Sequence, residues 1–209
     1  MMPSDGLLAR QATLNIASPK KVCIVGVGGV GSWLALDLAL VGVNEIALVD
    51  DDIVEESNLN RTPFTYSQIG MHKVDAVAEL IAERRPECKV YPFPFRSEGL
   101  GDWTEFATND AMLIDCRDST EPLEVPGTYP CTIVGGYDGT SITLHTNPTP
   151  NVIFGDAVVR YRIVPSFVGA PALIASIMAS YIVLPKMRSA QEHVMTFDMV
   201  DLINIIDRS

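Results

Sequence analysis

Continuously apolar runs alternate along the chain with segments of helical periodicity. The run "KKVCIVGV" (residues 20–27) is typical of a strand buried on both faces. The segment after it places apolar residues at helical spacing, at Trp33, Leu34, Leu38 and Val41. Gly42 is a natural stop for that helix, and a second apolar run, "NEIALVD" (residues 44–50), follows it. The pattern therefore predicts a strand, a glycine turn, a helix and a parallel strand.

The same alternation continues to the end of the sequence. After an acidic loop, "HKVDAVAELIAERRP" reads as an amphipathic helix that Pro86 terminates. Proline interrupts the next strand, "CKVYPFPF", which places it near an edge of the sheet. "DAMLIDC" is another buried strand, and "CTIVGGYDGTSITLHTN" resembles two strands around a glycine-rich turn. "PALIASIMASYIVL" predicts the last helix, and "VMTFDMVDLINII" a closing strand.

This order of elements predicts an α/β fold with a doubly wound, mostly parallel sheet and additional C-terminal strands. A length of 209 residues suits one domain, so residues 1–209 are expected to form a single unit with an N-terminal arm over residues 1–20. In such sheets ligands bind at the carboxyl ends of the strands. The acidic loop and the polar "DCRDS" both follow strands at that edge.

Composition narrows the class of protein. Hydrophobic residues make up 47% of the chain and the mean hydropathy is +0.21, which excludes a disordered chain. A net charge of −11 argues against nucleic acid or an anionic membrane as a partner. The first residues lack the layout of a signal peptide, and the longest apolar stretch, residues 170–184, is broken by polar residues. We expect a cytoplasmic protein with no membrane span.

The glycine motif is the first candidate for chemistry. "GVGGVG" (residues 26–31) fits G-x-G-x-x-G between a strand and a helix. Gly26 would allow the tight turn, Gly28 would let the backbone approach a phosphate, and Gly31 would permit close helix–strand packing. Asp50 ends the second strand, where an acid can bind a ribose hydroxyl. These features predict a nucleotide or dinucleotide site, against the plainer alternative of a glycine turn without a ligand.

NAD or FAD is the obvious first ligand, but the rest of the chain favours a triphosphate. Since residues 1–209 are expected to form a single domain, we expect no second domain to hold a hydride acceptor. Asn58, Arg61 and Lys73 add an amide, a guanidinium and an ammonium at one strand edge, a set that suits a triphosphate. Asp118 ends a later strand and could hold Mg²⁺. For Lys73 or Arg61 taken alone, a solvated charged face is the plainer interpretation.

Several of these segments together resemble one family. "VGVGGVGS", "LVDDDIVEESNLNR", "GMHKV" and "LIDCRDS" are similar to the ThiF/MoeB/HesA family, the prokaryotic relatives of ubiquitin-activating enzymes. "VPSFVGAPALIASIMA" and "VMTFDMVD" resemble that family's later core helix and final strand. The resemblance implies a modified Rossmann sheet and an adenylyltransferase. Members use Mg·ATP to adenylate the C-terminal carboxylate of a small ubiquitin-like protein, a peptide, or a side chain on a tRNA base.

The resemblance also implies roles for particular residues. Asp50 resembles the ribose-binding acid, and Asp118 resembles the magnesium-linked acid. Arg10 resembles an arginine that dimers of the family insert into the neighbouring subunit's ATP site. The residues expected to bind ATP are Gly26, Gly28, Gly29, Gly31, Asp50, Asp52, Asn58, Arg61 and Lys73. The residues expected to act in catalysis are Arg10, Arg61, Lys73 and Asp118.

The cysteines depart from the family pattern. Members often carry two C-x-x-C zinc pairs and a cysteine loop before the last helix, and this chain has neither. We therefore expect no zinc. Cys23 and Cys116 lie inside apolar runs and are predicted to be buried. Cys131 precedes a core strand, which favours a structural role over a nucleophilic one. A thioester intermediate is then not expected.

The sequence thus predicts ATP-dependent adenylation of the C-terminal carboxylate of a ubiquitin-like protein or peptide, with release of pyrophosphate. The expected partners are that small protein or peptide and a second copy of the chain in a homodimer. The alternative is a nucleotide-binding regulatory or scaffold subunit that has lost the chemistry. An NAD-dependent oxidoreductase is a third and less favoured interpretation.

Overall fold

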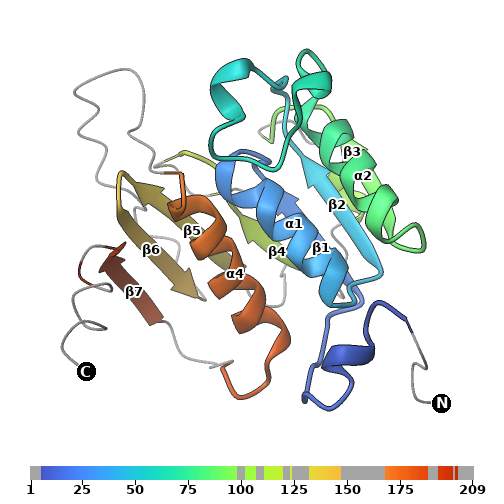
Figure 1. The fold of residues 1–209 in the computed structure, drawn as a ribbon, viewed down its shortest axis with the longest axis vertical. Helices are drawn as coiled ribbons and strands as arrows, with labels where there is room; N and C mark the ends of the chain where they lie inside the picture. Colours follow the sequence, from blue (N-terminus) through green and yellow to red (C-terminus); the bar gives the residue numbers. More distant parts are fainter. Residues whose placement is uncertain are drawn as a thin grey trace.

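The computed structural model describes residues 6–97, 102–106, 111–119, 123, 132–146, 168–187, 193–199 and 201. Its strands form one sheet in the order β3-β2-β1-β4-β5-β6-β7 (Figure 1). They span Lys21–Val25 (β1), Glu45–Val49 (β2), Lys89–Phe93 (β3), Ala111–Asp115 (β4), Thr132–Asp138 (β5), Ser141–Thr146 (β6) and His193–Asp198 (β7). Each expected strand is present, and β3, the strand that proline interrupts, lies at an edge of the sheet. The closing strand, expected over residues 194–206, is shorter than predicted: β7 ends at Asp198, Met199 and Asp201 are helical, and the rest of that segment lies outside the described residues.

The sheet changes direction at its C-terminal side. Strands β3, β2, β1, β4 and β5 run parallel, whereas β6 pairs antiparallel with β5 and β7 antiparallel with β6. The hairpin between β5 and β6 turns at Gly139, whose φ of +58° lies in the left-handed region that glycine favours. The doubly wound sheet with additional C-terminal strands is therefore confirmed.

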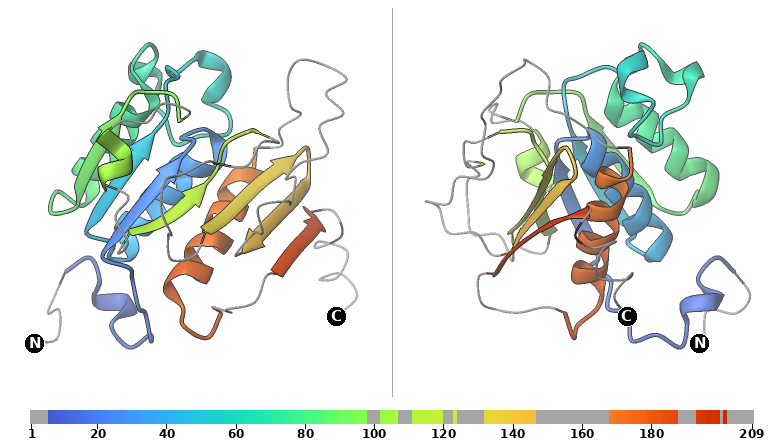
Figure 2. Two further views of the ribbon diagram at one scale, coloured as in Figure 1. Left: turned by 180° about the vertical axis from the view of Figure 1, so that it is seen from behind. Right: turned by 60° about the vertical axis from the view of Figure 1, so that its left-hand side comes forward.

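Helices cover the two faces unequally. The helices are α1 (Gly29–Val41), α2 (Lys73–Arg84), α3 (Asp102–Phe106) and α4 (Ala170–Val183). Helices α1, α2 and α4 pack on one face, and the short α3 lies on the other (Figures 1 and 2). Three 3₁₀ turns that the apolar pattern does not signal are η1 (Ala9–Gln11), η2 (Glu56–Asn58) and η3 (Tyr66–Gln68).

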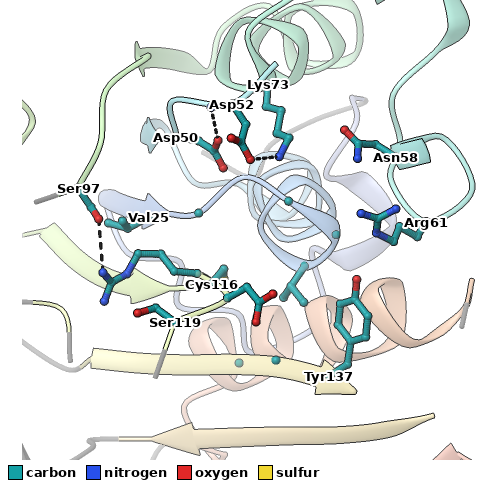
Figure 3. Close-up of a pocket in the computed structure, with 18 of the residues that line it drawn as sticks. Val25, Asp50, Asp52, Asn58, Arg61, Lys73, Ser97, Cys116, Ser119 and Tyr137 are labelled. Carbon is teal, nitrogen blue, oxygen red and sulfur yellow. Dashed lines mark hydrogen bonds and ion pairs between the residues drawn. The ribbon is translucent and has the colours of Figure 1, made fainter. Parts of the chain in front are cut away.

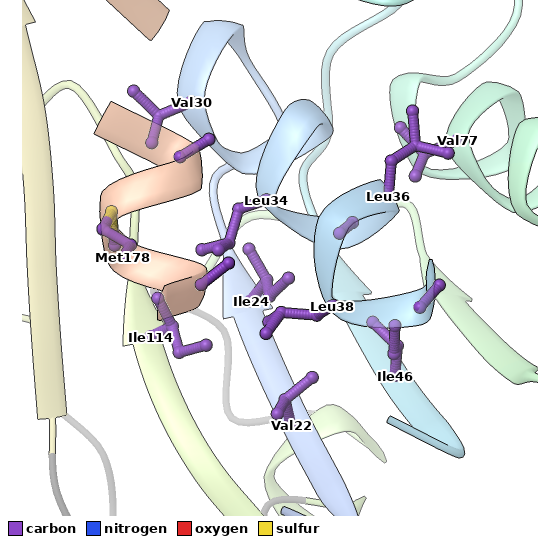
Figure 4. Packing of buried hydrophobic residues seen from close by; sticks show 14 of the residues in the cluster. Val22, Ile24, Val30, Leu34, Leu36, Leu38, Ile46, Val77, Ile114 and Met178 are labelled. Carbon is purple, nitrogen blue, oxygen red and sulfur yellow. The ribbon is translucent and has the colours of Figure 1, made fainter. Parts of the chain in front are cut away.

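The main core lies between the sheet and α1 with its neighbouring helices. Leu34 and Leu38 of α1 pack toward Ile24 of β1, while Leu36 points toward Val77 of α2 (Figure 4). All five side chains are at most 4% exposed. Burying a leucine or isoleucine contributes about 1.5–3 kcal/mol each, so this layer fixes α1 and the glycine turn at its start. Within the described residues, no helix is long and apolar enough to cross a membrane.

The N-terminal arm packs at the end of the sheet opposite to the carboxyl ends of β1, β2 and β4. Its contacts include Gln11 Nε2 donating to the Leu40 carbonyl at 3.4 Å and Ser18 Oγ donating to the Val41 carbonyl at 3.3 Å. Both acceptors belong to the last turn of α1. Figure 1 shows η1 below the strands, at the amino-terminal edge of β1.

A buried arginine closes the C-terminal end of α1. Arg85 is 4% exposed, and its Nη1 donates to the carbonyls of Ala39 and Val43, each at 2.5 Å. Its Nη2 donates to Asn44 Oδ1 at 2.7 Å, and its Nε to Glu87 Oε1 at 3.1 Å. A cation here satisfies carbonyl groups at the negative end of the helix. Pro86 follows at once, which explains why α2 ends at Arg84.

Replacing Arg85 with alanine is expected to lower the free energy of unfolding by about 3 kcal/mol, because several buried acceptors lose their donor. Urea denaturation followed by circular dichroism measures the loss. Arg84→Ala is the matched control, since Arg84 is exposed and is expected to cost less than about 1 kcal/mol. Equal losses in the two variants would contradict this role of Arg85.

Candidate functional site

The glycine turn between β1 and α1 has the backbone geometry that the motif predicts. Gly26 has a φ of +88°, and a Cβ there would lie 2.7 Å from the backbone nitrogen of Arg117. A Cβ on Gly31 would lie 1.9 Å from the Gly26 carbonyl oxygen, so only glycine allows the helix to approach the turn. A Cβ on Gly28 would meet nothing within 4 Å. The backbone is therefore tightly packed around Gly26 and Gly31, whereas Gly28 has free space that a ligand could occupy.

Gly31→Ala is expected to lower the free energy of unfolding by more than about 3 kcal/mol. The new methyl group would clash with the backbone of Gly26, which cannot move aside as a side chain could. The better helix propensity of alanine, about 1 kcal/mol, offsets only part of this loss. Gly28→Ala, at the open position, is the matched control and should cost much less. Thermal denaturation of both variants checks the ranking, and a Gly31→Ala protein as stable as the wild type would contradict it.

Asp50 holds the glycine turn against the end of β2. Its Oδ2 accepts a hydrogen bond from the Val27 backbone N–H at 2.6 Å, and its Oδ1 accepts one from the Asp52 N–H at 2.9 Å. The Gly26 N–H also donates to the Val49 carbonyl at 2.8 Å. The carboxylate predicted for ribose thus lies beside the turn predicted for phosphate.

Lys73 and Asp52 form an ion pair at the start of α2. The Nζ–Oδ2 distance is 2.6 Å, and the exposed fractions of the two side chains are 11% and 65%. The Lys73 backbone N–H also donates to the Asp52 carbonyl at 3.0 Å. Lys73 is the first residue of α2, where the helix dipole disfavours a cation. A lysine buried at this end of a helix is better suited to an anionic ligand than to stabilising the fold.

The loop that carries Asn58 and Arg61 is fixed by three kinds of contact. Asn58 is buried, and its Oδ1 accepts a hydrogen bond from the Glu55 backbone N–H at 3.0 Å in a capping box around η2. Arg61 Nη1 donates to the Ser57 carbonyl. Trp33 of α1 donates from Nε1 to the Arg61 carbonyl at 3.0 Å. Trp33, expected only as part of an apolar stripe, therefore ties this loop to the helix that begins at the glycine turn.

The end of β4 contributes a second ion pair. Asp115 is 7% exposed, and its carboxylate accepts hydrogen bonds from Arg117 Nε at 3.0 Å and Nη2 at 2.9 Å. Asp118 follows on the exposed side. Within the described part of the chain, no hydrogen bond or ion pair engages the Asp118 carboxylate. It is a carboxylate available to a cation.

Burial disfavours the thiolate form of the described cysteines. Burial raises the pKa of the Cys23 thiol to about 12. Burial, and then the neighbouring Asp115 charge, raise the pKa of Cys116 well above its ordinary value. Burial also raises the pKa of Cys88, although the Arg85 charge acts against it. A reactive thiolate needs a lowered pKa, so the raised pKa values argue against a nucleophilic role for these three thiols. Cys131 lies outside the described residues.

The glycine turn, the acidic loop, Lys73 and the segment after β4 surround one cavity of about 1340 Å³ at the carboxyl ends of the parallel strands (Figure 3). In Figure 3, Lys73 and Asp52 face Cys116 and Ser119 across the opening, and Asn58 and Arg61 lie at one end with Tyr137 below them. The predicted site residues that line the cavity are Gly26, Gly28, Gly29, Asp50, Asp52, Asn58, Arg61, Lys73 and Asp118. Residues far apart in the sequence, from the glycine turn to Asp118, therefore meet at one site.

Two predicted residues lie elsewhere. Gly31 packs behind the glycine turn and does not line the cavity. Arg10 lies in η1, at the opposite end of the sheet, and is exposed. Conversely, sequence reasoning missed Arg117 and Tyr137, which do line the cavity. Arg117 stands inside the quoted motif "DCRDS", so its signal was present, whereas nothing in "YDGT" distinguishes Tyr137 from a hairpin residue.

Asp50, Asp51 and Asp52 could suggest a metal site, since one carboxylate oxygen of each lies within 4.8 Å of the others. Each already has a partner: Asp50 the turn amides, Asp51 the Arg96 guanidinium at 2.9 Å, and Asp52 Lys73. The three carboxylates therefore hold the glycine turn, Arg96 and Lys73 in place. Asp118, whose carboxylate is available, is the better fit to Mg²⁺.

Comparison with known proteins agrees with this geometry. The ThiF family matches residues 8–123, which is more than half of the chain. The chain belongs to the ThiF family. The matched segment includes the glycine turn, the acidic loop, Lys73 and Asp118, so the described pocket is built largely from the part of the chain that defines the family.

Individual relatives of this ThiF-family chain match over part of their length. The adenylyltransferase and sulfurtransferase UBA4 of Eremothecium gossypii is 36% identical over 115 residues, covering 54% of this chain and 25% of that protein. The first curated relatives are matched over about a quarter of their own length.

Solved structures share the fold. The structure of E. coli MccB with ATP has a TM-score of 0.60 and 18% identity, covering 87% of this chain and 64% of that one. E. coli tRNA N6-threonylcarbamoyladenosine dehydratase, TcdA, in complex with AMP has a TM-score of 0.50 and 27% identity, covering 60% and 57%. The Rossmann-like fold predicted from the sequence is thus confirmed by the sheet itself and by these neighbours.

Proposed function

We propose that this protein uses Mg·ATP to adenylate the C-terminal carboxylate of a ubiquitin-like protein or peptide and releases pyrophosphate. The observation that carries the proposal is one cavity that joins an open glycine turn, the Asp50 carboxylate and the cations Lys73 and Arg61. The names of the relatives support it: UBA4 is an adenylyltransferase, and TcdA was solved with AMP. A plain dinucleotide site needs no such set of cations.

The chemistry follows from electrostatics. A carboxylate that attacks the α-phosphate brings two anions together, and the oxygen bridging the α- and β-phosphorus atoms leaves with pyrophosphate. Lys73 and Arg61, together with the amides at the start of α1, offset the negative charge that develops. Asp50 would bind the ribose and hold the α-phosphate in line with the attacking oxygen. Mg²⁺ at Asp118 would add positive charge beside the phosphates.

Activation is proposed to stop at the acyl-adenylate. The substrate supplies the nucleophile, so the protein needs no nucleophile of its own. The raised pKa values of Cys23, Cys88 and Cys116 argue against a thioester on any of these three thiols. The adenylate would then pass to a sulfur donor or an amine.

Oxygen labelling tests this reaction. A peptide that ends in glycine is prepared with ¹⁸O in its C-terminal carboxylate and incubated with the protein, Mg·ATP and hydroxylamine. Attack by the carboxylate transfers one labelled oxygen to AMP when hydroxylamine captures the acyl group. The proposal predicts AMP that carries one ¹⁸O atom. Unlabelled AMP, or ADP with phosphate as the products, would contradict it.

A further inference from the structure

The arrangement of Asp115 and Arg117 fixes the plane of a guanidinium group. Arg117 donates from Nε and Nη2 to the two oxygens of Asp115, at 3.0 and 2.9 Å, and its backbone N–H donates to Oδ1 at 3.0 Å. Its Nη1 also reaches Ser97 Oγ at 3.4 Å. Two parallel bonds hold a guanidinium and a carboxylate in one plane.

The Asp115–Arg117 pair presents a flat guanidinium face to the cavity and carries no net charge. The Asp115 carboxylate neutralises Arg117, and the exposed fractions of the two side chains are 9% and 15%. In that plane Nε and Nη2 donate to Asp115, and Nη1 reaches Ser97. Arg117 nevertheless lines the cavity, so its face is the part suited to a ligand.

The position of this face follows from the order of the other groups. Asn58 and Arg61 lie at one end of the cavity, Asp50 lies between, and Ser97 lies at the other end (Figure 3). If phosphates occupy the first end and ribose lies at Asp50, the nucleobase extends toward Ser97. Apolar residues also line the cavity around the ends of β1, β2, β3 and β4: Val25, Val49, Phe95 and Cys116.

We propose that Arg117, held flat by Asp115, is the surface on which the nucleobase of ATP stacks. Guanidinium planes stack on aromatic rings and on bases, and a planar, charge-neutralised one does so without competing for phosphate. This role rests on the proposed function, because it needs a nucleotide in the cavity. It makes Arg117 a residue that contributes affinity for the base, beside the cations that bind phosphate.

The test compares ligands with and without a base. Calorimetry with Mg²⁺ present measures the affinity of wild type and Arg117→Lys for ATP, AMP and inorganic tripolyphosphate. Lysine keeps the positive charge but has no plane. We expect ATP and AMP affinity to fall about 5- to 30-fold, with tripolyphosphate affinity unchanged within about twofold. Arg117→His, which restores a flat ring able to donate to Asp115, should recover part of the loss.

Two further variants serve as positive and negative controls. Lys73→Ala should weaken both ATP and tripolyphosphate, while Arg84→Lys, on the exposed side of α2, should change neither. Unchanged ATP affinity in Arg117→Lys, equal loss for ATP and tripolyphosphate, or no recovery in Arg117→His would overturn the stacking role. A wild-type protein that binds neither ATP nor tripolyphosphate would overturn the proposed function itself, and with it this role.

Discussion

Replacing Lys73 with alanine is expected to slow ATP–pyrophosphate exchange about 10²–10³-fold, the loss typical of removing one preorganised charge from a transition state. Its ammonium group is held at 2.6 Å from Asp52 at the edge of the cavity, so its position is set before ATP arrives. Exchange rates measured at saturating ATP separate this loss from weaker binding. Lys89→Ala, at the exposed start of β3, is the matched control and should retain the wild-type rate.

The same substitution should leave stability nearly unchanged, although Lys73 is only 9% exposed. Its removal relieves a cation at the positive end of α2. Asp52, whose side chain is 65% exposed, stays hydrated and lies near the same helix end, where a carboxylate is favourable. A melting temperature within a few degrees of wild type, together with the slow exchange, is the expected result. Full exchange activity in a folded Lys73→Ala protein would mean that the site is misplaced.

Arg10→Ala is expected to reduce exchange by about 10³-fold or more if Arg10 acts as an arginine finger, a device worth about 10³–10⁵ in other phosphoryl systems. Arg10 cannot reach the cavity of its own chain. The arm containing it is tied to the last turn of α1, whereas the cavity lies at the first turn. The 13 residues of α1 separate the two by about 20 Å. We therefore propose a homodimer in which each arm completes the neighbouring site.

Mixed dimers test this shared site. Arg10→Ala and Lys73→Ala subunits should each be inactive alone, whereas a verified mixed dimer should regain part of the activity because one of its two sites has both residues. The alternative is a surface arginine on a chain terminus, with no catalytic role. Normal activity in Arg10→Ala, or no recovery in the mixed dimer, would favour that alternative.

The fold could be predicted because its signals are local. Continuous apolar runs mark β1, β2 and β4, and Gly42 and Pro86 follow the ends of α1 and α2 closely. Pro92 within β3 and Pro94 just after it predicted an edge position, where a missing N–H is tolerated. The turns η2 and η3 were not predicted, because capping boxes made by side chains such as Asn58 stabilise them, and hydrophobic periodicity does not report such bonds. The turn η1 was not predicted either, since its three residues are too few to show a helical period.

The site could be predicted only where a motif names its residues. Asp50, Asn58, Lys73 and Asp118 line one cavity as the motifs indicated. The second role of Trp33 could not be foreseen, because its hydrogen bond to the Arg61 carbonyl depends on how α1 and the acidic loop meet in space. Side chains that act through tertiary contacts leave no local pattern.

ATP–pyrophosphate exchange measured on one peptide in two chemical forms tests adenylation most directly. The peptide ends in Gly-Gly, once as the free acid and once as the C-terminal amide, with Mg·ATP and labelled pyrophosphate. An enzyme that adenylates a C-terminal carboxylate should incorporate label into ATP with the acid and not with the amide, and Lys73→Ala should slow that incorporation about 10²–10³-fold. Equal exchange with both forms, or cleavage of ATP to ADP and phosphate, would contradict adenylation of a carboxylate.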